Sequence, residues 1–357
     1  MSVGIREWLI EAQKTKSSDL HICVGLPPKV RTHGRLVSLD YPALTADDTE
    51  RLIREVMDER HLEIFERDGE VDFAYSFGED GRSRVNIYRD KATWAGAFRL
   101  ITSTVPKAED LGIPNAVTDL YKKKSGLILV TGPTGSGKST TLASIISLIN
   151  SNLAQHIITL EDPIEYLHNH KKSIVNQREI GADCMSYANG LRAALREDPD
   201  VILVGEMRDL ETISIAITAA ETGHLVLSTL HTIGAAATID RIIDVFPVSQ
   251  QEQVRIQLGS VIEAVISQRL IQNKTADGRC AAFEVMLAVP AVRNLIRENK
   301  TYQIQSVIQT NKEIGMQTLD NSIYELYVND KISKLEALRN SVDYAAMEKA
   351  IIGGGRI

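Results

Sequence analysis

The sequence predicts an α/β protein in which a parallel sheet carries a phosphate-binding loop, preceded by a smaller α/β domain. Short apolar runs at 127–130, 157–160, 201–204 and 225–227 alternate with helical stretches. Such continuous runs are typical of strands that are buried on both faces of a parallel sheet. Directly after the first run, residues 132–139 read Gly-Pro-Thr-Gly-Ser-Gly-Lys-Ser and lead into a helical pattern. The chain has 357 residues, which is enough for two domains.

Composition narrows the class of protein. The chain has 40 basic and 47 acidic residues and a net charge of −7, whereas a protein that binds duplex DNA usually presents a basic surface, so we expect no nucleic-acid partner. The three cysteines, Cys23, Cys184 and Cys280, form no Cys-x-x-Cys pair and predict neither a disulfide framework nor a zinc site.

No apolar run approaches the ~20 residues of a membrane-spanning helix, and residues 1–6 do not begin like a signal peptide. We therefore expect a cytoplasmic protein with no direct insertion into the membrane.

Residues 1–101 are predicted to form the first domain, of mixed helices and strands. Apolar and polar residues alternate in 72–77, which is the period of a half-buried strand. Thr45 precedes acidic residues and a helically spaced apolar set, which is the pattern of a helix N-cap. We expect helices over 4–15 and directly after Thr45. We expect strands over 20–24, 29–32, 35–39, 72–77, 82–88 and 94–101.

A linker is predicted over residues 102–116, because Pro106, Gly112 and Pro114 stand there among polar residues. The second domain then covers 117–357. Beyond residue 250 the pattern is mainly helical, so a helical C-terminal region is expected to follow the sheet.

The glycine-rich turn matches the pattern G-x-x-x-x-G-K-[ST] in the strand–loop–helix setting that supports it. Its glycines allow backbone N–H groups to surround phosphate oxygens, and the N-terminus of the following helix adds a partial positive charge. Lys138 is predicted to neutralise the β- and γ-phosphates of ATP and to act in catalysis, and Ser139 to ligate Mg²⁺. The residues expected to contact the nucleotide are Gly132, Pro133, Thr134, Gly135, Ser136, Gly137, Lys138, Ser139 and Thr140.

Acidic residues follow two of the predicted strands. Glu206 comes after the third strand, at the edge where ligands bind in open α/β folds, and is predicted to hold Mg²⁺ through water and to serve catalysis. Three carboxylates, Glu161, Asp162 and Glu165, follow the second strand within five residues, an arrangement that favours a nearby cation. Hydrolysis also needs a carboxylate that orients the attacking water. Glu165 is our candidate, although spacing alone does not choose among the three.

His224 and His231 flank the predicted strand Leu225–Leu230. A single histidine is usually a structural residue. Two histidines at the ends of one strand beside a nucleotide site are as consistent with a sensor of the γ-phosphate as with a structural role. Their separation is not a usual zinc-ligand spacing. We therefore include both among the candidate site residues, His231 as catalytic and His224 as a nucleotide contact.

Together these motifs resemble the PilT family, the type IV pilus retraction motors of the secretion-ATPase superfamily. The resemblance runs almost the length of the chain. It is carried by Ser-Asp-Leu-His at 18–21, Gly-Leu-Pro-Pro at 25–28, the Walker A motif at 132–141, the Asp box at 161–165, the Walker B region at 198–209, the His box at 222–232 and the C-terminal signature at 291–298.

The resemblance implies a PAS-like N-terminal domain, a RecA-like ATPase domain, ATP and Mg²⁺ as cofactors, and a homo-hexamer. It implies that Glu165, the last residue of the Asp box, is the catalytic carboxylate. It also implies an inner-membrane pilus platform protein as partner, and hence a peripheral position at the inner face of the cell membrane.

Arginines of the N-terminal domain help to bind phosphate in the family, and Arg82, Arg84 and Arg99 occupy the matching positions. From the residue pattern alone, Arg82 and Arg84 would form one solvated face of a strand. His33 stands where the family commonly has an acidic residue, so no role is carried over to that position.

The signature at 291–298 is predicted to be a helix. Pro290 suits its first turn, and Ala291 and Leu295 are spaced to face the core, with Val292 and Ile296 beside them. Arg293 and Arg297 would lie on another face. The residue pattern is satisfied by a packing helix with a solvated basic edge, whereas the resemblance implies a helix that couples nucleotide turnover to the pilus machinery.

The leading prediction is an ATP-driven motor that pulls pilin subunits out of a pilus. An assembly or type II secretion ATPase of the same superfamily is the first alternative. Those proteins typically carry an extra N-terminal domain and a four-cysteine zinc insertion, and we expect this chain to have neither. A nucleic-acid translocase is disfavoured by the net charge of −7, and a nucleotide-gated scaffold without turnover by the intact acidic set. The direction of work rests on the resemblance, because nothing in a phosphate-binding loop distinguishes retraction from assembly.

Overall fold

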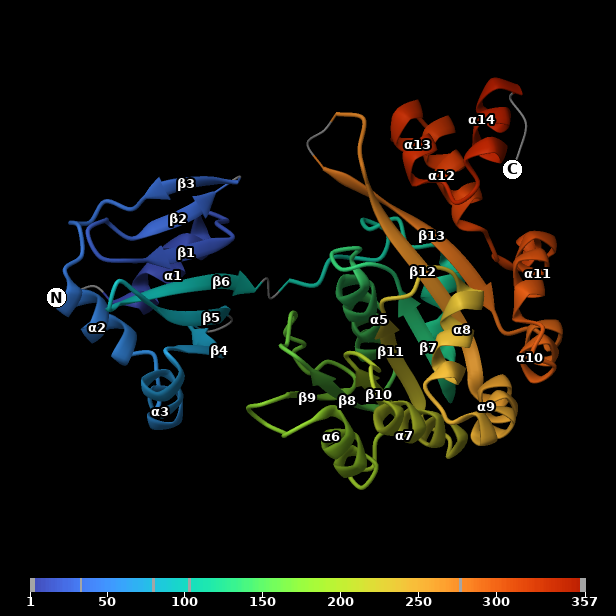
Figure 1. The fold of residues 1–357 in the computed structure, drawn as a ribbon, viewed down its shortest axis with the longest axis horizontal. Coiled ribbons are helices and arrows are strands. Elements are labelled where there is room, and N and C mark those ends of the chain that lie inside the picture. The colour runs from blue at the N-terminus through green and yellow to red at the C-terminus, as the bar shows by residue number, and fades with distance from the viewer. Residues whose placement is uncertain (1–3, 33, 79–80, 102–103, 276–277, 354–357) are drawn as a thin grey trace. The chain divides into compact units, whose positions relative to one another are not determined.

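The computed structural model describes residues 4–32, 34–78, 81–101, 104–275 and 278–353. His33 lies outside these residues. The described chain forms two compact units, each with its own sheet and its own hydrophobic core (Figure 1). The first unit comprises the residues up to Thr104 together with 165–167, and the second comprises the remainder.

The first unit is an antiparallel sheet of six strands on which helices pack. The strands lie in the order β3-β2-β1-β6-β5-β4. The elements are α1 (Ile5–Lys14), β1 (Asp19–Ile22), β2 (Lys29–Thr32), β3 (Arg35–Ser38), α2 (Ala46–Arg54), α3 (Glu59–Asp68), β4 (Glu70–Phe77), β5 (Gly81–Asp90) and β6 (Thr93–Ile101). The predicted helices and strands are present, and α3 is an addition to them.

Local sequence explains these elements. Thr45 caps α2 as predicted, because its side chain accepts a hydrogen bond from the N–H of Asp48. Gly69 ends α3 in the left-handed conformation that glycine adopts without steric cost. Apolar residues of α1 recur at helical spacing, and four of them are buried against the sheet: Ile5, Trp8, Leu9 and Ala12.

The second unit is built on a sheet of seven strands in the order β13-β12-β7-β11-β10-β8-β9. All neighbouring strands are parallel except β12 and β13. Its elements up to the end of the sheet are α4 (Asn115–Thr118), β7 (Gly126–Thr131), α5 (Lys138–Asn152), β8 (His156–Glu161), β9 (Ile174–Glu179), α6 (Tyr187–Ala194), β10 (Val201–Val204), α7 (Leu210–Glu221), β11 (Leu225–Leu230), α8 (Ala235–Asp244), α9 (Val248–Val261), β12 (Ile262–Gln272) and β13 (Arg279–Leu287).

The sheet is buried on both faces, as the apolar runs predict. Leu127 and Leu129 of β7 belong to one hydrophobic cluster, whereas Ile128 and Val130 belong to another. Because successive side chains of a strand point to opposite faces, helices must cover both sides of β7. The predicted α/β class is confirmed.

The hairpin of β12 and β13 corrects the prediction that the chain beyond residue 250 is mainly helical. β12 pairs with β7 on one side and with β13 on the other. It begins directly after α9 ends at Val261, and its apolar run cannot be distinguished from a buried helix by periodicity. The hairpin therefore extends the parallel sheet by two strands that the sequence pattern did not separate from the helix before them.

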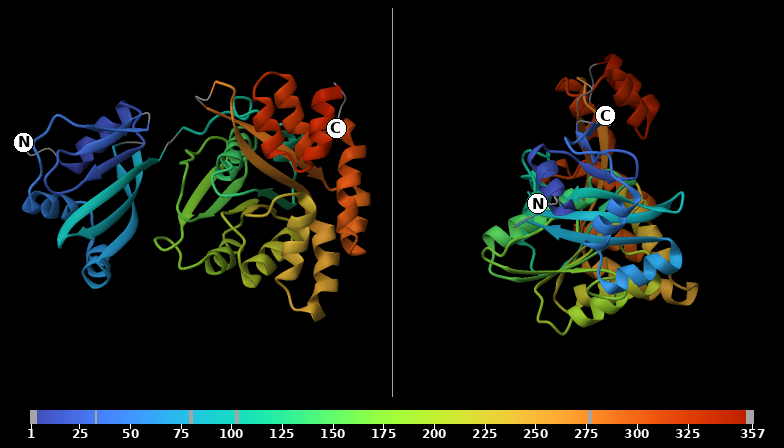
Figure 2. Two further views of the ribbon diagram at one scale, coloured as in Figure 1. Left: turned by 45° about the horizontal axis from the view of Figure 1, so that its top comes forward. Right: turned by 90° about the vertical axis from the view of Figure 1, so that its left-hand side faces the viewer.

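In the described part of the chain five α-helices follow the hairpin, and Figure 2 shows them in red and orange beside it. They are α10 (Pro290–Arg297), α11 (Ile304–Thr310), α12 (Leu319–Val328), α13 (Lys334–Asn340) and α14 (Tyr344–Gly353). Short 3-10 helices occur at Asp119–Lys122, Thr301–Gln303 and Lys312–Ile314. Among the described residues, no helix is long and apolar enough to cross a membrane.

Helix α10 begins at Pro290 as predicted, but its faces differ from the prediction. Val292 and Ile296 are buried and Leu295 packs against the core, as expected, whereas Ala291 is exposed. Arg293 is not part of a solvated edge, because its guanidinium group donates hydrogen bonds to backbone carbonyl oxygens and pairs with a carboxylate. Arg297 is exposed.

Candidate active site

The glycine-rich loop lies between β7 and α5, at the edge where the parallel strands end. Gly132, Gly135 and Gly137 have φ angles of 143°, 77° and 90°, which residues with a side chain rarely adopt. Gly132 also has no room for a side chain, because a Cβ atom there would lie 2.3 Å from the carbonyl oxygen of Gln268. Loop N–H groups and the N-terminus of α5 together make the kind of site that binds an anion.

The ammonium group of Lys138 lies within the curve of this loop. Its Nζ donates hydrogen bonds to the carbonyl oxygens of Gly132 (2.9 Å) and Pro133 (3.1 Å), and the residue is only 9% exposed. Ser139 follows in the first turn of α5. The hydroxyl of Ser136 is buried and has no hydrogen-bond partner among the residues that the structure describes. Since buried polar groups are normally paired, this hydroxyl is available to a ligand of the loop.

Gln268 of β12 supports the loop from the neighbouring strand, and the sequence analysis missed it. The hydroxyl of Thr141 in α5 donates a hydrogen bond of 2.7 Å to Gln268 Oε1. A Cβ atom on Gly137 would lie 2.9 Å from Gln268 Nε2. Gln268 therefore fixes both ends of the loop. Gln268 stands between the polar residues Ser267 and Arg269, so no local pattern distinguishes it from a surface residue.

Glu206 and His231 meet at the same edge, at the ends of the adjacent strands β10 and β11. His231 Nε2 lies 3.1 Å from Glu206 Oε1, and Arg208 Nη2 lies 2.6 Å from Glu206 Oε2. Burial would raise the pKa of Glu206, but the hydrogen bond from Arg208 and the nearby charges of His231 and Arg208 lower the pKa below its ordinary value. Arg208, which the sequence analysis did not single out, thus keeps this carboxylate ionised.

Two pockets adjoin these residues. One of about 380 Å³ is lined by Glu206, Arg208 and His231, among others. The other, of about 490 Å³, adjoins Gly137 and the first turn of α5. Its lining includes Leu111, Leu270 and Leu326. The lining of this second cavity also includes the charged residues Glu109, Asp110, Arg279 and Lys331, so it offers both apolar and polar contacts beside the loop.

Glu161 ends β8 and Asp162 follows it, at the edge where the parallel strands end. Glu161 Oε1 accepts hydrogen bonds from the Thr159 hydroxyl (2.7 Å) and from Gln177 Nε2 (3.1 Å). Burial, together with the charges of nearby carboxylates that include Asp162, raises the pKa of Tyr187 at the start of α6. The Tyr187 phenol therefore stays neutral beside this acidic group.

The two remaining predicted site residues are Glu165 and His224. Glu165 belongs to the short segment 165–167 that groups with the first unit, so its catalytic role stays a prediction. His224 precedes β11, whereas the loop follows β7, and these two parallel strands are in register. A six-residue strand spans about 20 Å, so His224 cannot reach a phosphate held by the loop of its own chain. Instead its Nδ1 contacts the Ala219 carbonyl at 2.9 Å, and for this chain's own site the prediction is wrong.

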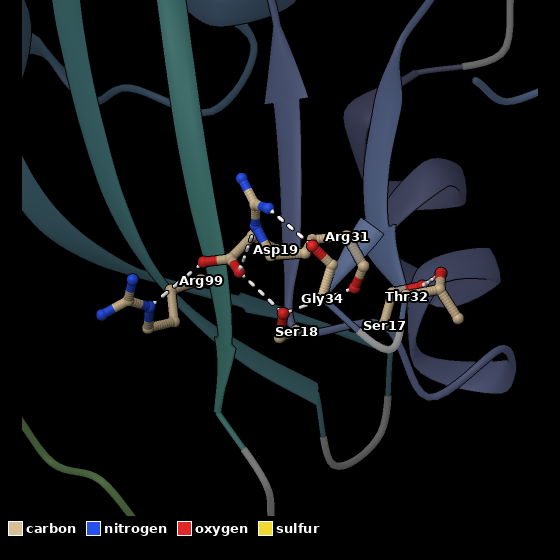
Figure 3. A network of polar contacts seen from close by, with 7 residues as sticks. All are labelled: Ser17, Ser18, Asp19, Arg31, Thr32, Gly34 and Arg99. Atoms are coloured by element: carbon tan, nitrogen blue, oxygen red, sulfur yellow. Dashed lines mark hydrogen bonds and ion pairs between the residues drawn. The ribbon is translucent and has the colours of Figure 1, made fainter. Parts of the chain in front are cut away.

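The predicted arginines form part of a polar row across the sheet of the first unit. Arg84 lies directly opposite Arg99 on β5 and β6, and Asp19 of β1 lies opposite Arg99 on its other side. Figure 3 shows Asp19 between Arg31 and Arg99. Arg99 Nε donates to Asp19 Oδ1 at 3.1 Å, although the Arg99 side chain is 74% exposed.

This row carries more positive than negative charge. Burial would raise the pKa of Asp19, but hydrogen bonds from Ser18 and Arg99 lower it below its ordinary value. Arg84 is exposed, and Arg82 is partly buried on the same strand face. Like charges opposite each other on adjacent strands are unfavourable, so Arg84 and Arg99 together form a surface suited to an anion.

The chain is similar to proteins of known description. It matches the model of the type II/IV secretion system proteins over residues 111–339. It is 48% identical to a twitching motility protein of Neisseria gonorrhoeae, over 90% of this chain and 86% of that protein. It is 47% identical to PilT of Pseudomonas aeruginosa, described as a type IV pilus retraction ATPase, over 94% of this chain and 97% of that protein. A crystal structure of the pilus retraction motor PilT with bound ADP has a TM-score of 0.91 and 49% identity, and covers 98% of this chain and 100% of that chain.

Proposed function

The chain belongs to the type II/IV secretion system protein family and, within it, to the PilT family, and we propose on this premise that it is the ATP-hydrolysing motor of type IV pilus retraction. Its second unit has the RecA-like architecture of an ATPase domain, its first is the smaller PAS-like α/β domain, and helices follow the sheet. The observation that carries the proposal is that the phosphate loop, Glu206 and His231 meet at one edge of this parallel sheet.

ATP is the proposed substrate. Its phosphates lie against the N–H groups of the loop and the N-terminus of α5, with Lys138 between the β- and γ-phosphates. Lys138 then exchanges the carbonyl oxygens of Gly132 and Pro133 for phosphate oxygens. The nucleoside lies in the pocket of about 490 Å³ beside Gly137, which has apolar side chains for a base and polar groups for a ribose.

The remaining groups at this edge suit a Mg²⁺ ion and an attacking water. Ser139 and Glu206 supply the hydroxyl and carboxylate oxygens that Mg²⁺ prefers, and when bound the ion adds positive charge beside the phosphates. Both oxygens of Glu206 already contact Arg208 or His231, so Glu206 holds the ion through water. Glu165 orients the attacking water, and His231 senses the γ-phosphate through its contact with Glu206.

The arginines of the first unit complete the site. Arg82, Arg84 and Arg99 add positive charge around the γ-phosphate, where negative charge accumulates during transfer. In the proposed homo-hexamer these arginines serve the nucleotide of a neighbouring subunit. The sheet row in which Arg84 and Arg99 face each other supports this role, because a bound anion relieves their mutual repulsion.

The motor acts at the inner face of the cell membrane, against an inner-membrane pilus platform protein. A deletion strain tests the direction of work. Loss of retraction leaves excess pili on the surface and abolishes surface motility, whereas loss of an assembly or secretion ATPase of the same superfamily leaves the surface without pili. Absence of pili in the deletion strain, restored by the wild-type gene, would overturn the proposal in favour of assembly.

A further inference from the structure

The loop that carries His231 is held at its far end by the β12–β13 hairpin. Residues 231–234 connect β11 to α8. The Ser267 hydroxyl accepts a hydrogen bond of 2.9 Å from the N–H of Gly234, and Glu284 Oε1 accepts one of 2.7 Å from the N–H of Ala235. Ser267 and Glu284 face each other across β12 and β13. They are 1% and 5% exposed, so water does not compete for these contacts.

Glu284 replaces a cap that α8 lacks. The residue before α8 is Gly234, which has no side chain to cap the helix. A carboxylate from a distant strand takes this place at the positive end of the helix dipole. Burial raises the pKa of Glu284, although hydrogen bonds from the backbone of Ala235 and Leu319 oppose that effect. A buried carboxyl is costly unless it is hydrogen-bonded, so its position here calls for a specific role.

Adjacent residues of β12 serve the two loops of the site. Gln268 holds the phosphate loop through Thr141. Ser267 pairs with Thr131 at the end of β7 and holds the His231 loop through Gly234. One strand therefore sets the distance between the two loops.

We infer that Ser267 and Glu284 are positioning residues for ATP hydrolysis, which hold the 231–234 loop so that His231 meets Glu206. This inference rests on the proposed role of His231. Without the two contacts the start of α8 loses its anchors, and the His231 side chain leaves the carboxylate that it contacts at 3.1 Å. The phosphate loop keeps its contact with Gln268. Loss of the two anchors should therefore lower the rate of turnover and leave the affinity for nucleotide unchanged.

The variant Ser267→Ala removes one anchor and leaves the fold's apolar contacts in place. We expect the kcat of the purified full-length protein to fall roughly 10-fold, which corresponds to a hydrogen bond of ~1–1.5 kcal/mol that serves the transition state. Affinity for a fluorescent ATP analogue should stay within twofold. Glu284→Gln should show the same division between turnover and affinity. The carboxylate accepts hydrogen bonds from the backbone of both Ala235 and Leu319, whereas the amide has only one oxygen to accept them.

Ser322→Ala is the matched control. Ser322 is also a buried serine, and its hydroxyl accepts a hydrogen bond of 3.0 Å from the N–H of Phe283, the residue before Glu284. It does not contact the 231–234 loop. The control should lower the Tm about as much as Ser267→Ala and leave kcat unchanged.

A double-mutant cycle with His231→Ala completes the test. If Ser267 acts through His231, adding Ser267→Ala to His231→Ala should slow turnover little further. The inference would be overturned if the fold-loss in kcat of the double variant equalled the product of the two single losses. It would also be overturned if Ser267→Ala had the same kcat as the control. If His231→Ala itself kept wild-type turnover, the sensor role in the proposed function would be wrong, and the inference with it.

Discussion

Replacing Arg293 by alanine should destabilise the second unit. The guanidinium group joins α10 to the end of α9 and the start of β12. It donates hydrogen bonds to the carbonyl oxygens of Ala288 (3.2 Å), Gly259 (3.1 Å) and Ser260 (2.6 Å), and to the Glu263 carboxylate (2.6 Å). The Arg293 and Glu263 side chains are 21% and 16% exposed, so solvent replaces these contacts only in part.

The expected size of the effect follows from these contacts. A buried hydrogen bond from a charged donor contributes about 1.5–3 kcal/mol, and partial exposure to solvent lowers each of these three to about 1 kcal/mol. The ion pair adds less, because Glu263 keeps a second partner, Lys123, at 2.6 Å. The free energy of unfolding should therefore fall by about 3–4 kcal/mol. At about 2–4 °C per kcal/mol for a unit of this size, the Tm should fall by roughly 10 °C in a thermal melt.

Arg297→Ala is the comparison that separates stability from coupling. Arg297 is exposed, and its contact with Asn294 is long, at 3.4 Å, so its loss should change stability by no more than about 0.5 kcal/mol. If the helix couples ATP turnover to the pilus machinery, Arg297→Ala should keep basal ATPase activity and lose retraction in cells. A Tm of Arg293→Ala within 2 °C of the wild type, a margin of about 1 kcal/mol or less, would refute the packing argument. Parallel loss of ATPase activity and retraction in Arg297→Ala would refute the coupling.

Four further predictions concern the site. Lys138→Ala should reduce ATP hydrolysis to background in a steady-state assay, because a cation is removed where charge accumulates; near-normal turnover of the folded variant would contradict the assignment. Glu165→Gln should retain ATP binding and lose roughly 10²–10⁴ in kcat, and loss of binding would indicate a structural role instead. Mixing inactive Arg84→Ala with inactive Lys138→Ala subunits should restore some activity if the arginine acts across subunits, whereas mixed rings without recovery would indicate action within one chain. Arg208→Ala should move the acid limb of the pH–rate profile to higher pH, because the pKa of Glu206 then rises towards its ordinary value; an unchanged limb would mean that Glu206 does not control it.

The pH dependence of stability has a defined sign at Glu206. The pKa of this carboxyl is lower in the folded chain than its ordinary value of 4.5. Its contribution to stability is therefore present above about pH 4.5 and is lost as the pH falls through the folded pKa. Arg208→Ala should reduce this contribution in unfolding experiments at neutral pH.

The site positions that the sequence could indicate belong to local patterns or to strand ends. The loop at 132–139 is a continuous motif, and its chemistry does not depend on distant contacts. Glu206 and His231 follow apolar runs, and the carboxyl ends of parallel strands share one edge of a sheet. Their meeting could therefore be predicted without knowledge of the strand order.

The residues that the sequence analysis missed act over long distances along the chain. Gln268 contacts Thr141, and Glu284 contacts Ala235, through a hairpin that was not separated from the preceding helix. No periodic pattern in the neighbouring sequence indicates such long-range contacts. His224 was misplaced for a different reason: two histidines near each other in sequence lie at opposite ends of a strand, and hence at opposite edges of the sheet. Arg293 has helical spacing that suits a solvated edge, and only the packing of α10 reveals its buried partners.

The central claim is that ATP hydrolysis at this site drives pilus retraction. Imaging of fluorescently labelled pili on living cells tests it most directly, in a deletion strain that expresses either the wild-type chain or Lys138→Ala at equal levels. Pili should retract with the wild-type chain, and should extend but fail to retract with Lys138→Ala. Retraction at wild-type frequency and speed in cells that contain only Lys138→Ala would contradict it.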